Sequence, residues 1–99
     1  MIMKFKFDIQ KVDIVNLNGV DLKESFEAQY SVSFEKTIGN LVFENTSDID
    51  LVDKAREIHR GNEVEFTERE KGMFEECIKG KYIPFIERQI LGQVVEVRD

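Results

Sequence analysis

The dipeptide Asn18-Gly19 restricts the fold of this chain more than any other feature, because it sets how the first third of the sequence can pair with itself. Asn-Gly favours a two-residue type I′ hairpin turn, in which both turn residues need a positive φ. A two-residue loop also fixes the register of the strands that it joins, so that Val15 faces Leu22. We therefore predict an antiparallel β-hairpin over residues 1–32.

The two arms of this hairpin have an apolar and a polar face. The segment FEAQYSV alternates apolar and polar residues, which is typical of a half-buried strand. In the predicted register, however, Val12 and Ile14 fall on the polar face. Asp13 would also oppose Glu24 as an unfavourable like-charge pair. Either a β-bulge near residues 10–13 shifts the phase of the first strand, or Val12 and Ile14 form a small exposed apolar spot for a partner.

Apolar residues at helical spacing predict about four short helices in the rest of the chain. Residue types that favour helix starts precede or open them, at Ser33, at Ser47 or Asp48, at Thr67 in a capping box with Glu70, and at Pro84. The predicted spans are about residues 34–45, 48–60, 68–79 and 84–91. The segment QVVEV that follows extends the last helix or forms a short strand, and the sequence leaves both alternatives open.

These patterns predict an α+β fold in a single domain, residues 1–99. The hairpin forms residues 1–32, and the helices of residues 33–99 pack on one of its faces. A chain of 99 residues, 41% of them hydrophobic, suffices for one core. Eight phenylalanines and no tryptophan indicate a core anchored by phenylalanine.

Charge and composition exclude several classes of function. A net charge of -6 at pH 7 disfavours direct binding of nucleic acid, because an acidic surface repels phosphate. A single cysteine indicates a reducing compartment, and no apolar run approaches the ~20 residues that span a membrane. We expect a cytoplasmic protein that contacts neither membranes nor nucleic acid.

The candidates for catalysis or metal binding are few. His59 is the only histidine, and it lies with Arg56 and Arg60 in the predicted last turn of a helix, where cationic groups complement the helix dipole. Cys77 lies in an apolar helical stripe, which indicates a core side chain rather than a reactive thiolate. Neither residue has partners at the spacing of a metal site or a nucleophile motif. We expect no catalytic, metal-binding or cofactor-binding residues.

One long stretch, IGNLVFENTSDIDLVDKAREIHRG, resembles a pattern in small uncharacterised proteins of bacterial phages, prophages and other mobile elements. In that pattern a hairpin with an NG turn leads into a helix of the IGN-x-VF-x-N kind, a second helix that closes with glycine, and a capped pair of helices. The resemblance covers about residues 14–91. It implies a phage or prophage gene expressed in a bacterial cytoplasm, and it implies no activity.

We expect a small acidic interaction protein that is not an enzyme, for example a phage accessory or assembly protein. The open edges of a hairpin favour pairing with another chain, and a homodimer is the simplest outcome. Phe85, in the segment FIERQIL, is a further candidate for a partner surface. A second hypothesis is an acidic inhibitor that mimics DNA and binds a host nucleic-acid-binding enzyme. Its carboxylate strip would come from Asp21, Glu24 and Glu27, or from Asp48, Asp50 and Asp53.

Two further hypotheses have less support. A small enzyme would need a pocket that holds His59 beside Glu57 or Glu63. A DNA-binding helix-turn-helix would need a shorter connection than the one between the second and third predicted helices, and less acidic helix starts.

Overall fold

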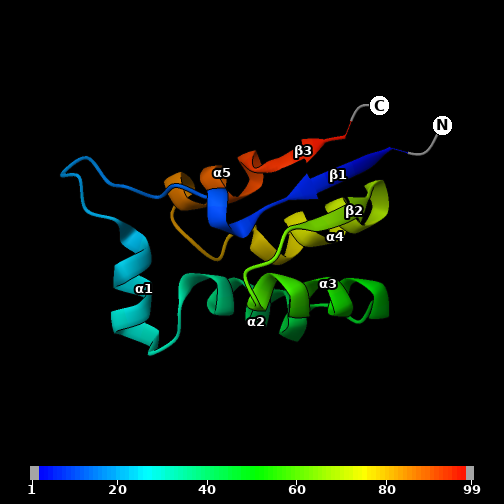
Figure 1. Ribbon diagram of the computed structural model, residues 1–99, viewed down its shortest axis with the longest axis horizontal. Helices are drawn as coiled ribbons and strands as arrows, with labels where there is room; N and C mark the ends of the chain where they lie inside the picture. The colour runs from blue at the N-terminus through cyan, green and yellow to red at the C-terminus, as the bar shows by residue number, and fades with distance from the viewer. Residues whose placement is uncertain (1–2, 98–99) are drawn as a thin grey trace.

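The computed structural model describes residues 3–97 and has an α+β fold (Figure 1). Along the chain the elements are β1 (Lys4–Phe7), the 3-10 helix η1 (Ile9–Lys11), α1 (Leu22–Tyr30), α2 (Phe34–Asn45), α3 (Ile49–His59), β2 (Val64–Thr67), α4 (Glu68–Ile78), α5 (Pro84–Gly92) and β3 (Val94–Glu96). The predicted fold class is confirmed, and the helices outnumber the prediction by α1 and the short η1.

The strands form a three-stranded antiparallel sheet in which β1 lies between β2 and β3. Burial alternates along β1, so that Phe5 and Phe7 face the core while Lys4 and Lys6 face solvent. Phe66 of β2 lies opposite Phe5 and is also buried. One face of the sheet therefore packs on helices and the other stays exposed, which agrees with the predicted packing of helices on one face.

Phenylalanine rings hold the sheet to the helices, as the composition predicts. The ring of Phe74 on α4 lies 4.9 Å from that of Phe7 and 5.0 Å from that of Phe66. Aromatic pairs at such distances are worth about 0.5–1.5 kcal/mol beyond the area that they bury. Below this cluster α2 and α3 pack against each other (Figure 1).

The predicted hairpin is wrong: of its first arm only Lys4–Phe7 forms a strand, and Ile9–Lys11 form the 3-10 helix η1. β1 pairs with β2 and β3, both far away in sequence, and residues 22–30 form helix α1 instead of a returning strand. A turn is present here, but it is not the predicted two-residue type I′ turn: Gly19 has a φ of +78° whereas the φ of Asn18 is not positive. The Asn16 amide donates to the Val20 carbonyl at 2.9 Å, so three residues lie between the paired positions. Only one isolated bridge, Val15 with Asp21, extends it.

The reason is that residues 22–30 satisfy two periodicities at once. The alternation that indicates a strand also places Leu22, Phe26 and Tyr30 four residues apart, on one side of a helix. Asp21 decides between them locally, because its side chain accepts a hydrogen bond from the Lys23 amide as an N-cap. A strong cap in front of an i, i+4, i+8 stripe outweighs a short alternating run.

The four predicted helices are confirmed as α2 to α5. Asp48, rather than Ser47, caps α3, and the capping box of Thr67 with Glu70 opens α4. Ser33 precedes α2, but its side chain makes no capping hydrogen bond. The open alternative at the end of the chain is resolved in favour of a strand, β3, whose pairing with β1 completes the sheet.

Within residues 3–97, the helices all fall short of the length and apolar character that crossing a lipid bilayer requires.

Candidate functional site

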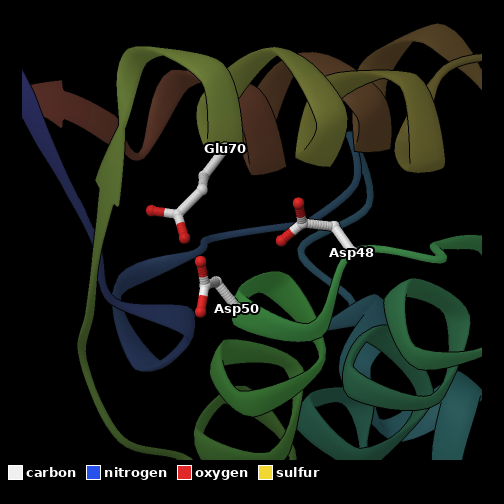
Figure 2. Close-up of side chains that lie close together, drawn as sticks. All are labelled: Asp48, Asp50 and Glu70. Atoms are coloured by element: carbon white, nitrogen blue, oxygen red, sulfur yellow. The ribbon is translucent and has the colours of Figure 1, made fainter.

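Three carboxylates converge where α3 and α4 begin. Asp48 and Asp50 come from the start of α3 and Glu70 from the first turn of α4. Figure 2 shows the three side chains pointing toward one another, and one ligand oxygen from each lies within 4.8 Å of the others. Oxygen clusters of this kind suit hard cations. Their origin is local, since both helix starts favour negative charge at the positive end of the helix dipole.

Two basic side chains already neutralise this cluster. The Lys54 ammonium lies 2.9 Å from Glu70 Oε1, and the Arg69 guanidinium contacts both Asp48 and Asp50. Lys54 also donates to the backbone carbonyl of Glu65. The cluster therefore works as an electrostatic clamp that joins the starts of α3 and α4 to β2.

The protonation of the clamp agrees with this role. The hydrogen bond from Arg69 lowers the pKa of Asp48, and the Leu51 amide adds to the effect. Burial raises the pKa of Glu70, but the Thr67 amide and Lys54 outweigh it, so the pKa is lowered overall. Both carboxylates are thus held in the charged form that their partners need. The sequence predicts the bond between Thr67 and Glu70 but not the contribution of Lys54, 16 residues away.

His59 lies beside a cavity of about 230 Å³ between α2 and α3. From α3, the basic side chains of Arg56, His59 and Arg60 line it; from α2, Asn40 and Phe43 do. The position of His59 at the end of α3 agrees with the sequence prediction, but the cavity beside it was not predicted. Of the two carboxylates considered as partners of His59, Glu57 instead binds Arg60 and Asn62, and Glu63 lies 3.9 Å from the ammonium of Lys6.

Cys77 occupies the core, as its apolar stripe predicts. Its side chain is 5% exposed, and burial raises the pKa of the thiol above its ordinary value. A thiol with a raised pKa holds little thiolate at neutral pH, so this position is poorly suited to nucleophilic chemistry.

The predicted partner residues are distributed differently from the expectation. Val12 and Ile14 are fully buried, so the expected apolar spot on the surface is wrong. Asp21 serves as the cap of α1, and Glu24 lies exposed in the first turn of that helix. Phe85 is 39% exposed near the start of α5.

We call the end of the long axis of the molecule at which α1 lies the α1 end (Figure 1). It comprises the loop before α1, α1 itself and the start of α5. Six of the ten large hydrophobic side chains exposed in residues 3–97 belong to it, and among them Leu17 is fully exposed. The six are Val15, Leu17, Val20, Tyr30, Ile83 and Phe85.

A groove of about 540 Å³ opens between α1 and the start of α5. Its apolar lining includes Phe26, Tyr30, Tyr82 and Ile83. The Phe26 and Tyr82 rings lie 5.4 Å apart and connect α1 to α5. Burial, together with Tyr30, raises the pKa of Tyr82 to about 12, so its hydroxyl stays neutral at physiological pH. The groove is therefore a largely aromatic surface, with Lys81 as the one charged side chain among the described residues that line it.

Comparisons of this chain with protein-family models, with curated proteins and with solved structures find no match.

Proposed function

We propose that this chain is a non-enzymatic interaction protein that forms a homodimer through its α1 end. The observation that carries the proposal is the concentration of exposed apolar side chains at that end. Exposed apolar side chains that gather in one region mark contact surfaces in soluble proteins, whereas single exposed hydrophobic residues are ordinary.

The packing of α1 supports a partner at this position. Phe26 is the only buried residue of α1, and its ring contacts those of Phe34 and Tyr82 at 5.2 and 5.4 Å. A helix of nine residues gains most of its stability from packing an apolar face. Phe26 is thus the one buried side chain that anchors α1 to the rest of the molecule. Tyr30, which is 51% exposed, and the groove beside it are therefore available for contact with a partner.

The shape of the α1 end favours a second copy as that partner. Leu17 projects fully exposed from the loop, and the aromatic groove opens at the same end of the molecule. In a two-fold dimer the same surface patch meets itself, so each Leu17 enters the groove of the other copy.

The alternative, an acidic mimic of DNA, has less support from the arrangement of charges. Basic side chains lie among the carboxylates of the sheet and of helices α3 and α4 and form ion pairs with them. Examples are Lys4 with Glu65 and Arg56 with Asp53. Asp48 and Asp50, two of the residues considered for a mimetic strip, contact Arg69. Mimicry of a phosphate backbone needs an uninterrupted strip of negative charge.

We also propose a cellular setting for this function. A cytoplasmic accessory or assembly protein of a phage or prophage is consistent with the resemblance in residues 14–91. Dimerisation through α1 would serve such a role without any catalytic residue.

The test is the mass of the protein in solution, measured by light scattering during size-exclusion chromatography at low and high salt. We expect about twice the chain mass of 11.6 kDa at both salt concentrations, because apolar contacts are not screened. Leu17→Asp should raise the dissociation constant of the dimer at least tenfold, because the variant places a charge in the groove of the other copy. A monomer at every concentration tested would overturn the proposal.

Ile49→Asp is the matched control for that variant. Ile49 is 76% exposed at the start of α3, outside the α1 end, and a negative charge suits a helix start. It should leave the dimer unchanged. If both variants dissociate the protein equally, the contact does not lie at the α1 end.

A further inference from the structure

The cavity between α2 and α3 differs in charge from the rest of this acidic protein. The chain has 20 aspartates and glutamates, yet among the described residues that line the cavity there is no carboxylate. Instead, the basic residues Arg56, His59 and Arg60 line the cavity, all from the last turn of α3 and its C-cap. A concentration of basic groups at one hollow of an acidic surface attracts small anions.

The two arginines retain donors for a ligand. Arg56 lies 3.7 Å from Asp53, a separation longer than a good hydrogen bond, and both side chains are well exposed. Exposed ion pairs of this kind contribute little, so a ligand can displace them. Arg60 binds one oxygen of Glu57 at 2.9 Å, and Asn62, in the loop after α3, donates to the other oxygen of that carboxylate at 2.8 Å. A guanidinium has five N–H donors, of which one such contact uses one or two.

The remaining walls are apolar or uncharged. Phe43 is 47% exposed and forms an aromatic wall, and Asn40 adds an amide. A methyl group on Gly39 would lie 2.7 Å from the Cβ of His59, so glycine is what lets the end of α3 lie this close to α2. That contact fixes His59 at the edge of the cavity.

We infer that this cavity binds a small organic anion, a phosphate or carboxylate carried on an aromatic or apolar body. The anionic group is bound by Arg56 and Arg60, because the planar guanidinium matches two oxygens of phosphate or carboxylate. The body of the ligand lies against Phe43. A volume of about 230 Å³ limits the ligand to a small molecule and excludes a folded partner.

Phenyl phosphate, phenylacetate and inorganic phosphate are the probes for this site. Each is titrated at constant ionic strength into the ¹⁵N-labelled full chain while amide shifts are followed by NMR. We expect saturable shifts confined to about residues 39–43 and 55–61 with both aromatic anions, and at least tenfold weaker binding of inorganic phosphate.

Inorganic phosphate that binds as tightly as phenyl phosphate would overturn the inferred ligand class. Amide shifts that do not saturate, or that spread over the molecule, would overturn the site. If only one aromatic anion binds, the anionic group is thereby identified.

Two variants with glutamine in place of arginine test whether Arg56 binds the anionic group. Arg56→Gln should weaken binding of phenyl phosphate at least tenfold, because it removes the fork of donors. Arg88→Gln, an exposed arginine on α5, is the matched control and should leave binding unchanged. Equal loss in both variants would show a general charge effect and contradict the inference. The dispersion of the amide spectrum confirms that each variant is folded.

Discussion

Gly39 is a residue at which this fold tolerates little change, because the end of α3 lies against it. It lies inside α2, where glycine costs roughly 1 kcal/mol relative to alanine, so its presence needs a reason. The reason is contact: an added Cβ would lie 2.8 Å from the backbone nitrogen of His59 as well as 2.7 Å from its Cβ. The sequence shows the glycine in a helical pattern, but only the fold shows which backbone approaches it.

Gly39→Ala should therefore destabilise the protein, although alanine favours helices. We expect a loss of about 1–3 kcal/mol in the free energy of unfolding, measured with urea, because α3 must move away from α2. Gly72→Ala is the control, since Gly72 lies inside α4 with open space around it and should gain about 0.5–1 kcal/mol. Equal changes of the same sign in the two variants would contradict the close contact.

Single residues were predictable where their environment is local. The position of His59 at a helix end and of Cys77 in a helical stripe follows from a few neighbouring residues, and both predictions are confirmed. Val12 and Ile14 lie outside any regular element, so no periodicity indicates that they are buried. Their burial depends on segments distant in sequence, such as α5, whose Gln89 donates to the Asp13 carbonyl at 2.8 Å.

Among the elements, the start of α4 combines local and distant stabilisation. Thr67 and Glu70 form the capping box, and Lys54 from α3 pairs with the same buried carboxylate. The lowered pKa of Glu70 means that its charged form stabilises the fold. This contribution is present above the ordinary pKa of 4.5 and is lost as the pH falls through the lower pKa of the folded state.

Glu70→Gln should remove this contribution. At pH 7 we expect a loss of roughly 1–3 kcal/mol in the free energy of unfolding, because Lys54 loses its charged partner. Below pH 4.5 the difference between the variant and the original chain should shrink, as measured by urea unfolding across that range. The exposed Glu76, on the same helix, is the control: Glu76→Gln should change stability by less than about 0.5 kcal/mol. A difference that persists unchanged into acid would contradict the role of the Glu70 charge.

Elements were predictable where periodicity and caps agree. For α2 to α5 the apolar stripe and the residues at the helix starts indicate the same span, and the structure confirms them. For α1 the two signals conflict, because FEAQY fits a strand as well as a helix. β2 and β3 are only 4 and 3 residues long, so their sequences carry too little pattern, and their pairing with β1 depends on contacts across the whole chain.

At the scale of the whole molecule, the α1 end gives the protein its elongated form, with extents of 44 × 26 × 23 Å. A hairpin would have presented open strand edges for dimerisation, whereas the structure presents a loop, a thinly packed helix and a groove. The expected homodimer thus remains a prediction, but with a different surface. Of the exposed apolar side chains at this surface the sequence indicated only Phe85, because they come from two segments that only the fold brings together.

The measurement that tests this account most directly is an isotope-filtered NOE experiment on a sample mixed from ¹³C-labelled and unlabelled chains. It detects only contacts between copies. We predict cross-peaks between the Leu17 methyl groups of one copy and the ring protons of Tyr30 or Tyr82 of the other. Intermolecular cross-peaks that arise elsewhere, or none in a sample that scatters as a monomer, would contradict dimerisation through the α1 end.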